Sequence, residues 1–294
     1  MSRKSARPSN FGTNTPRRLN EFRQTDPSPY DLKSLKAEEL RRAATENADV
    51  DGMNWTTESL SRNVSRVTMN VPTTVGWEQW FLLSSDRHHD NAHTDHALER
   101  RHLEQAVERG AGIIDAMQGK WDRRQDRCAL REEYQGGDYL DALVREAANF
   151  YGTSAANWIV MGRGNHEQAI YKHHETDLVE RTVEAIKTKS PETPLVAGGY
   201  GGWIVLPDAD IVLTGHTHDA WMVPIARERI SARGTISHDE QVHIRSSTYK
   251  DEYGDGHSGW HVETMKPPKP RGAWWLRFYF NDKETLAWQA IRAT

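Results

Sequence analysis

Three short apolar runs, each ending in a group of polar side chains, constrain this chain more than any other feature. The runs cover residues 80–85 (WFLLSS), 158–163 (WIVMGR) and 209–214 (ADIVLT). The polar groups that follow them are Asp86-Arg87-His88, Gly164-Asn165-His166-Glu167 and Gly215-His216-Thr217-His218. A short apolar run is typical of a buried strand, and the ends of neighbouring strands lie side by side at a sheet edge. We therefore expect the three groups to converge on one crevice, although any one of them alone would fit a solvated loop.

The segments between these runs predict helices. Apolar residues recur every three or four positions over His96–Arg109, Tyr139–Tyr151 and Val179–Ile186, as on the buried face of a helix. His102 shares the apolar face of the first of these helices, so we interpret it as a core histidine.

Shorter apolar stretches predict the strands. We expect them at Gly76–Ser85, Ala111–Asp115, Asn157–Met161 and Asp210–Leu213, with mainly β structure after Trp221, including AWWLRFYF and TLAWQAI. Alternation of strands and helices is typical of the α/β fold class.

The composition divides the chain into three parts. Residues 1–28 are rich in Ser, Pro, Asn and Arg and poor in apolar residues, which predicts a disordered basic tail. Residues 29–70 are expected to form an accessory helical or extended segment. Residues 71–294 contain the strand and helix pattern and are the expected main domain.

The net charge and cysteine content narrow the class of protein. A net charge of -4 at pH 7 and a pI near 6.4 lack the basic excess of a dedicated nucleic-acid binder. The single cysteine, Cys128, forms no internal disulfide. Neither a signal-peptide core nor an apolar run of bilayer length is present in the sequence. We expect a cytoplasmic protein with no membrane insertion; the sequence does not indicate its oligomeric state.

The candidate donors in these polar groups are the Asp86 carboxylate, several imidazoles and the Asn165 amide. This set of donors suits divalent ions such as manganese, iron and zinc better than it suits a structural thiolate site. The candidate metal-binding residues are Asp86, His88, Asn165, His216 and His218.

The order of these motifs resembles that of the calcineurin-like metallophosphoesterases. Their pattern runs D-x-H, G-D-x-x-D, G-N-H-D/E, a lone His and G-H-x-H, and the resemblance covers roughly Trp80 to Trp221. The tracts DAMQGKWD and STYKDEYGDG further resemble phage and bacterial members. The resemblance implies an α/β sandwich of two β-sheets flanked by helices.

The resemblance also implies a role for each site residue. Asp86, His88 and His218 would bind a first metal ion, and Asn165 and His216 a second. His166 would act on the scissile phosphate or protonate the leaving oxygen, so His166 and Asn165 are the implied catalytic residues. Arg87 and Arg163 are candidates for substrate binding, with a solvated position as the alternative.

Two elements of the family pattern are missing or altered. In GAGIIDAMQGKWD, alignment on MQGK puts Gly112 at the metal-bridging position, whereas alignment on the apolar GII puts Asp115 at the strand end. We favour Asp115 as the bridge; the alternative is that it only caps the strand. No histidine occurs between Glu175 and Gly215, so the lone family histidine is absent. His173 and His174 are expected to face solvent, and the second metal site is expected to be weak.

The resulting expectation is a metal-dependent phosphoesterase. Its substrate would be a phosphodiester or phosphomonoester, attacked by a metal-activated water. The cofactor would be one or two divalent ions per chain, manganese first, with iron, zinc or nickel as alternatives. Two other hypotheses remain: a catalytically impaired binding protein, and a nuclease whose basic tail holds DNA or RNA.

Overall fold

The computed structural model describes residues 55–61, 63–69, 71, 76–116, 138–205, 211–254, 260–281 and 286–294. Its centre is a six-stranded sheet with the strand order β12-β11-β3-β4-β5-β6. The strands are β3 (Glu78–Ser84), β4 (Gly112–Asp115), β5 (Trp158–Met161), β6 (Val196–Ala197), β11 (Ala273–Phe280) and β12 (Leu286–Ala293). Strands β3 to β6 are parallel to one another, so their carboxyl ends share one edge.

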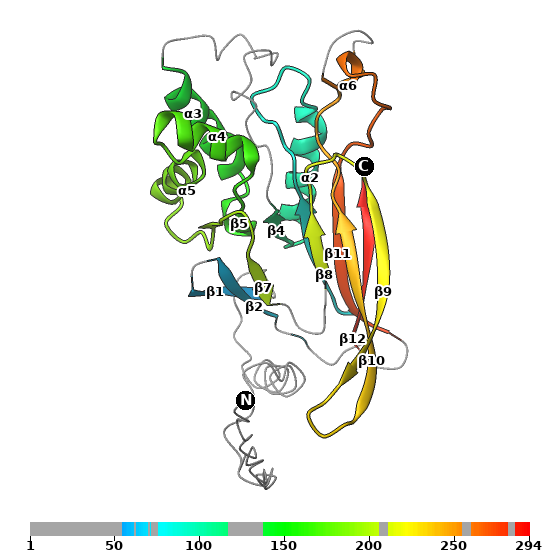
Figure 1. Cartoon of the computed structure of the whole chain (residues 1–294). Coiled ribbons are helices and arrows are strands. Elements are labelled where there is room, and N and C mark those ends of the chain that lie inside the picture. Colours follow the sequence, from blue (N-terminus) through cyan, green and yellow to red (C-terminus); the bar gives the residue numbers. More distant parts are fainter. Residues whose placement is uncertain are drawn as a thin grey trace, which may run out of the picture.

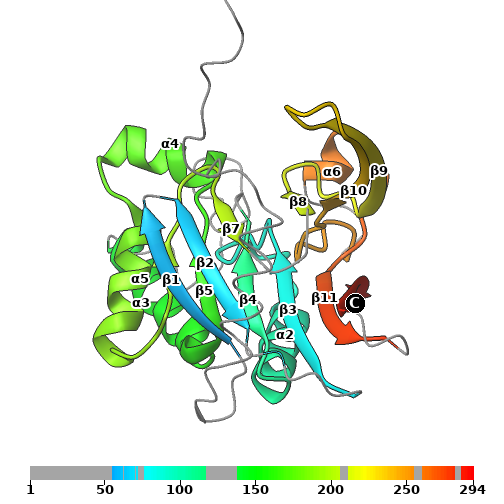
Figure 2. The ribbon, with the colours of Figure 1, turned by 90° about the horizontal axis from the view of Figure 1, so that it is seen from below.

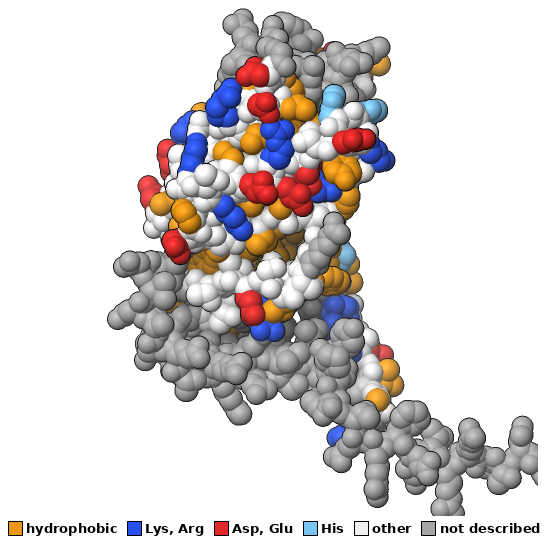
Figure 3. Space-filling view, turned by 90° about the vertical axis from the view of Figure 1, so that its left-hand side faces the viewer, with side chains coloured by type: hydrophobic (Ala, Val, Ile, Leu, Met, Phe, Trp, Pro, Cys, Tyr) orange, Lys and Arg blue, Asp and Glu red, His pale blue; other side chains and the backbone are white. Residues whose placement is uncertain are grey.

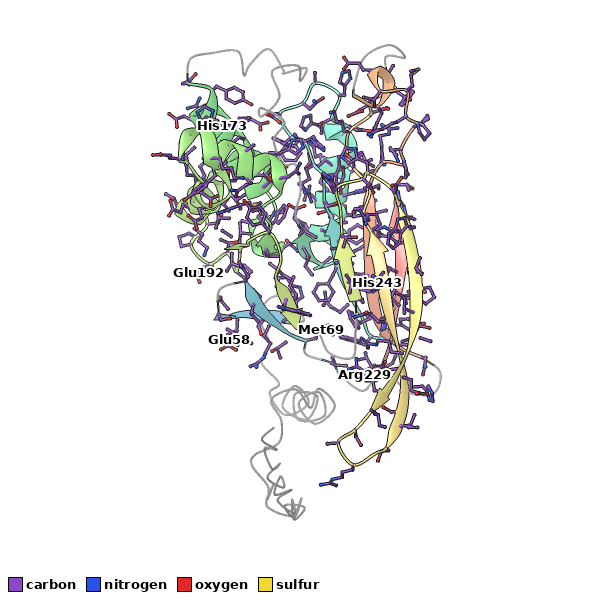
Figure 4. All side chains as sticks on the ribbon, viewed as in Figure 1. Glu58, Met69, His173, Glu192, Arg229 and His243 are labelled. Carbon is purple, nitrogen blue, oxygen red and sulfur yellow. The ribbon has the colours of Figure 1, made fainter. Side chains whose placement is uncertain are left out.

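Two three-stranded sheets accompany the central sheet (Figure 1). One contains β1 (Trp55–Ser61), β2 (Val64–Met69) and β7 (Trp203–Val205). The other contains β8 (Ile211–Thr214), β10 (Ile236–Arg245) and β9 (Trp221–Ile230). Figure 4 labels Met69 on the first of these sheets and His243 on the second. The β9–β10 hairpin extends beyond the body of the molecule, and most of β9 is exposed.

The described helices lie at more than one side of the molecule (Figure 2). They are α2 (His96–Glu108), α3 (Tyr139–Gly152), α4 (Asn165–His174), α5 (Leu178–Lys189) and the short α6 (Trp260–Glu263), with a 3-10 turn, η2 (Ala155–Asn157). Asp95 accepts a hydrogen bond from the Leu98 backbone at the start of α2, and Asp177 caps α5 in the same way. Figure 2 shows α3, α4 and α5 at one side of the molecule and β9, β10 and α6 at the other. None of the described helices is long and apolar enough to cross a membrane.

The central sheet is buried on both faces because its side chains alternate. Leu82 and Trp275 pack with apolar residues of α2, α3 and α5. Phe81, Leu83 and Leu276 point to the opposite face and pack with residues of β2 and β10. The arrangement is therefore a mixed α/β fold with one core under the helices and one under the smaller sheets.

The predicted elements agree closely with the observed ones. The α/β class is confirmed at the level of a mixed α/β fold with several sheets. His102 is buried and its Nδ1 lies 3.0 Å from the Tyr249 hydroxyl, so its interpretation as a core histidine is confirmed. Burial lowers the pKa of His102 to about 4. His173 and His174 are exposed as expected, but they end α4 rather than begin a helix.

The predicted segment boundaries are only partly covered by the described residues. The predicted tail, residues 1–28, lies outside them, as does 29–54 of the accessory segment. The described remainder of that segment is extended, forming β1 and β2. Trp55, Val67 and Met69 join the same apolar core as β3, so this part of the chain packs as part of the main body.

Replacing Gly112 by alanine tests how closely β3, β4 and β5 pack. A Cβ atom here would lie 2.6 Å from Ile159 Cδ1 and 2.7 Å from Phe81 Cδ1. We expect Gly112→Ala to lower the free energy of unfolding by about 1–3 kcal/mol, measured by denaturant titration. Gly152→Ala is the control, because no atom lies within 4 Å of its added Cβ. Equal unfolding midpoints for the two variants would contradict this packing.

Candidate metal centre

Asp86, His88 and His218 form a buried group that can hold a metal ion. Asp86 and His88 directly follow β3, and His218 follows β8. The two strand ends lie in contact, because the His216 backbone N–H donates to Asp86 Oδ2 at 2.8 Å. A Cβ atom on Gly215 would lie 2.5 Å from Asp86 Oδ2. Glycine at this position therefore permits the close approach that brings His218 to Asp86.

The donor atoms of this group have the spacing of metal ligands. His218 Nε2 lies 3.1 Å from His88 Nε2 and 3.7 Å from Asp86 Oδ1. Bonds of about 2.0–2.2 Å to one ion, at angles near 90–110°, separate neighbouring ligand atoms by about 3–3.5 Å. A single divalent ion fits between the three atoms with small adjustments.

The electrostatics of the group favour a bound cation. Burial raises the pKa of Asp86 to about 7, although hydrogen bonds from the Ser85 hydroxyl and the His216 backbone act in the opposite direction. Burial, with the neighbouring His88 and His261, holds the pKa of His218 well below its ordinary value. A neutral His218 imidazole can bind a divalent ion directly. The positive charge of the ion would also stabilise the ionised form of the buried Asp86 carboxylate.

Backbone strain coincides with this site. Asp86, His88, His216 and His218 all have positive φ angles, between 46° and 84°. Such angles are unfavourable for residues with side chains and concentrate at functional sites. All four residues belong to the predicted ligand set, which argues that the chain is shaped to direct their side chains.

Two more predicted residues, Asn165 and His166, lie at the start of α4. The His166 ring is half-buried, and its centroid lies 5.1 Å from that of His88. Asn165 Oδ1 is buried and accepts no hydrogen bond from a described residue. Glu167 accepts a hydrogen bond from the Gly164 backbone N–H at 2.7 Å, which fixes the first turn of the helix. An unsatisfied amide oxygen costs free energy, and ligation of a cation would recover it.

The other two predicted ligands are placed differently. The His216 side chain is exposed, and it is outside the group formed by Asp86, His88 and His218. Asp115 is buried at the end of β4, where its Oδ1 accepts hydrogen bonds from Arg87 Nε at 3.2 Å and from the Ser84 hydroxyl at 3.2 Å. Gly112 lies at the start of β4, where a larger side chain meets Phe81 and Ile159. Of the two sequence alignments, only the one that uses Asp115 therefore places a carboxylate at the strand end.

The two predicted substrate-binding arginines are occupied by ion pairs. Arg87 is fully buried and donates to Glu99 Oε1 at 2.6 Å, to Asp115 and to the Ser84 hydroxyl at 2.8 Å. Because the Arg87 guanidinium is not exposed to solvent, a substrate cannot contact it. Its ion pairs with Glu99 and Asp115 stabilise the fold instead. Arg163 pairs with Asp177 and lies over the rings of Tyr171 and Tyr200.

Five residues with notable contacts were not predicted as ligands. His89 and Glu99 form a second group with His96, and Glu252 and His261 form a third with His218. His89 lies in the loop after β3. It is fully buried, and hydrogen bonds to Glu146 and Glu99 outweigh the opposing effect of burial and raise the pKa of His89 to about 9. The His96-x-x-Glu99 spacing on one helix face was the available signal.

A cavity of about 330 Å³ lies away from this metal centre. It is lined by residues of β1, β2, β7 and β8, by the glycines at 198, 199, 201 and 202, and by Asp115. Asp86, His88 and His218 are not on its wall.

Comparisons of the chain with protein-family models and with curated proteins find no match. The interpretation of the site consequently rests on its geometry and on the sequence motifs.

Substitution of Arg87 distinguishes a structural from a substrate-binding role. Arg87→Met leaves Glu99 and Asp115 without their buried cation, and we expect it to lower the free energy of unfolding by about 3–5 kcal/mol. The control is Arg227→Met, which removes a more exposed Arg–Asp pair on the β9–β10 hairpin, a change worth about 1 kcal/mol or less. Thermal and denaturant unfolding measure both. A fully stable Arg87→Met protein would contradict the structural role.

Proposed function

We propose that this chain is a metal-dependent phosphoesterase with a calcineurin-like sandwich fold. The observation that carries the proposal is the meeting of Asp86, His88 and His218 after the ends of β3 and β8, with the His166 ring beside that of His88. The central sheet, covered by helices on one face and by smaller sheets on the other, is compatible with such a sandwich.

The protein residues have distinct tasks in this proposal. Asp86, His88 and His218 would hold the principal ion, and the buried Asn165 amide oxygen would be a further donor. A divalent ion bound here supplies positive charge to the phosphate oxygens and lowers the pKa of a bound water. His166 donates a proton to the leaving oxygen, which suits a half-buried imidazole next to a phosphate site.

The proposed cofactor is one principal divalent ion, with manganese as the first candidate and iron, zinc or nickel as alternatives. Mixed oxygen and imidazole donors suit these ions. A second ion would rest on Asn165 and the exposed His216, because Asp115 is engaged by Arg87 and Ser84. We infer that a second ion binds more weakly than the first.

A noncatalytic binding protein is the rival interpretation. The engagement of Asp115 by Arg87 favours it, because loss of a bridging carboxylate removes a feature of two-metal hydrolysis. Binding of one ion without turnover of any phosphate ester, at any metal concentration, would decide for this rival.

A nuclease is the third interpretation. Dedicated nucleic-acid binders gather Lys and Arg on one face, whereas acidic and basic side chains are interspersed on the helical face shown in Figure 3. A steep fall of substrate affinity with salt would indicate nucleic acid as the substrate.

Removing the carboxylate of Asp86 tests the proposed function directly. Metal-free protein should gain activity toward a chromogenic phosphodiester or phosphomonoester when manganese is added. Asp86→Asn should lose both the bound ion and at least about a hundredfold in turnover, since the ion activates the attacking water. Asp239→Asn, on the exposed hairpin, is the matched control and should keep both. Metal-independent turnover in the wild-type protein would overturn the proposal.

Replacing His166 separates proton transfer from metal binding. We expect His166→Ala to reduce kcat by about a hundredfold or more while the metal content stays unchanged. Metal analysis and steady-state kinetics on the same preparation provide both readouts. Loss of the ion in His166→Ala would show that His166 is a ligand.

A further inference from the structure

A second group of metal-binding type lies next to Arg87, which pairs with its Glu99. It consists of His89, in the loop after β3, and of His96 and Glu99, in the first turn of α2. We propose that these three side chains bind a structural divalent metal ion of the zinc type, separate from the ion held by Asp86, His88 and His218.

The distances in this group suit a tetrahedral ion. Glu99 Oε2 lies 3.4 Å from His89 Nδ1 and 3.5 Å from His96 Nδ1. Zinc bonds of about 2.0–2.2 Å in a tetrahedron separate ligand atoms by about 3.3–3.5 Å. The two rings are nearly perpendicular, at 87°, with centroids 4.7 Å apart. Both imidazoles thus direct a nitrogen toward the same carboxylate oxygen at the spacing that one shared ion requires.

Outer partners orient two of the three donors, Glu99 and His89. The second oxygen of Glu99, Oε1, accepts hydrogen bonds from Arg87 at 2.6 Å and from the Tyr151 hydroxyl at 2.9 Å. Glu99 Oε2 is thereby turned toward the two histidines. The Nε2 atom of His89 contacts the Glu146 carboxylate. A carboxylate that binds the outer nitrogen of a histidine leaves Nδ1 as the metal-binding nitrogen, a common arrangement around zinc.

The charges around the group suit a bound cation. Arg87 pairs with Glu99 and Asp115, and the Glu146 carboxylate contacts His89. Arg100 lies over the neighbouring Phe150 ring, but it is exposed and its charge is screened by water. A divalent ion would add positive charge beside Glu99 and Glu146 while both imidazoles act as neutral ligands.

The position of the group gives the ion both a route of entry and a structural role. His96 is 25% exposed and Glu146 is 32% exposed, whereas His89 and Glu99 are fully buried. An ion can therefore enter along His96 and Glu146. Once bound, it would join α2 to the loop that begins with Asp86 and His88.

The test uses full-length Asp86→Asn protein, in which the candidate centre is disabled. Metal-free protein is titrated with Zn²⁺ and with Co²⁺, whose absorption spectrum reports tetrahedral coordination. We expect one equivalent to bind. Adding His96→Ala or His96→Gln should weaken that binding by at least about a hundredfold, and Glu146→Gln by about tenfold, as for loss of an outer partner.

His238→Ala in the same Asp86→Asn background is the matched control. It removes a histidine that also contacts a glutamate, at 3.0 Å, but on the exposed hairpin without a third donor. The affinity of the His238→Ala variant for Zn²⁺ and Co²⁺ should equal that of the Asp86→Asn protein. Binding unaffected by both His96 substitutions would overturn the proposal. So would a folded Asp86→Asn protein that binds no ion and shows His89 and His96 as imidazolium by NMR. Neither result depends on phosphoesterase activity.

Discussion

The buried guanidinium of Arg87 organises the part of the molecule where the candidate chemistry lies. It connects the end of β3 with α2 through Glu99 and with β4 through Asp115. The rings of Tyr151, Trp158 and Tyr249 surround it, with centroids 5.1–5.4 Å from its central carbon. Because Arg87 points into the interior, Asp86 and His88 on either side of it are turned toward His218, at the cost of positive φ angles.

The same interaction limits what the site can do. The favoured alignment of the sequence motif assigns the metal-bridging position to Asp115. In the structure, Asp115 is instead a counter-ion to Arg87. A carboxylate shared between a guanidinium and two metal ions would be a poorer ligand for each, because its negative charge is already partly neutralised. The short β4, whose first residue Gly112 has no room for a side chain, offers no replacement. The geometry therefore favours one strongly held ion.

The spacing of apolar residues predicted the helices and strands well, because this spacing shows which side chains are buried in the core. The helix face of Leu143, Val144 and Ala147 and the alternation of Phe81, Leu82 and Leu83 both reflect packing against one core. The same reasoning predicted that Asp86, His88 and His218 meet. It could not predict that Arg87 turns inward, because that depends on Glu99 and Asp115, which are brought near by tertiary packing. Likewise His216 and His218 look equivalent in GHTH, and only the turn geometry exposes one and buries the other.

Glu99 couples the two candidate metal groups. One of its oxygens binds Arg87, and the other faces His89 and His96. An ion at His89 and His96 would draw negative charge toward Oε2 and weaken the hold of Oε1 on Arg87. Arg87 would then rely more on Asp115, which would be still less able to bridge two ions. Because Arg87 is covalently flanked by Asp86 and His88, small shifts of its guanidinium are transmitted to both ligands. The structural group would thus influence the chemistry of the centre without contacting its substrate.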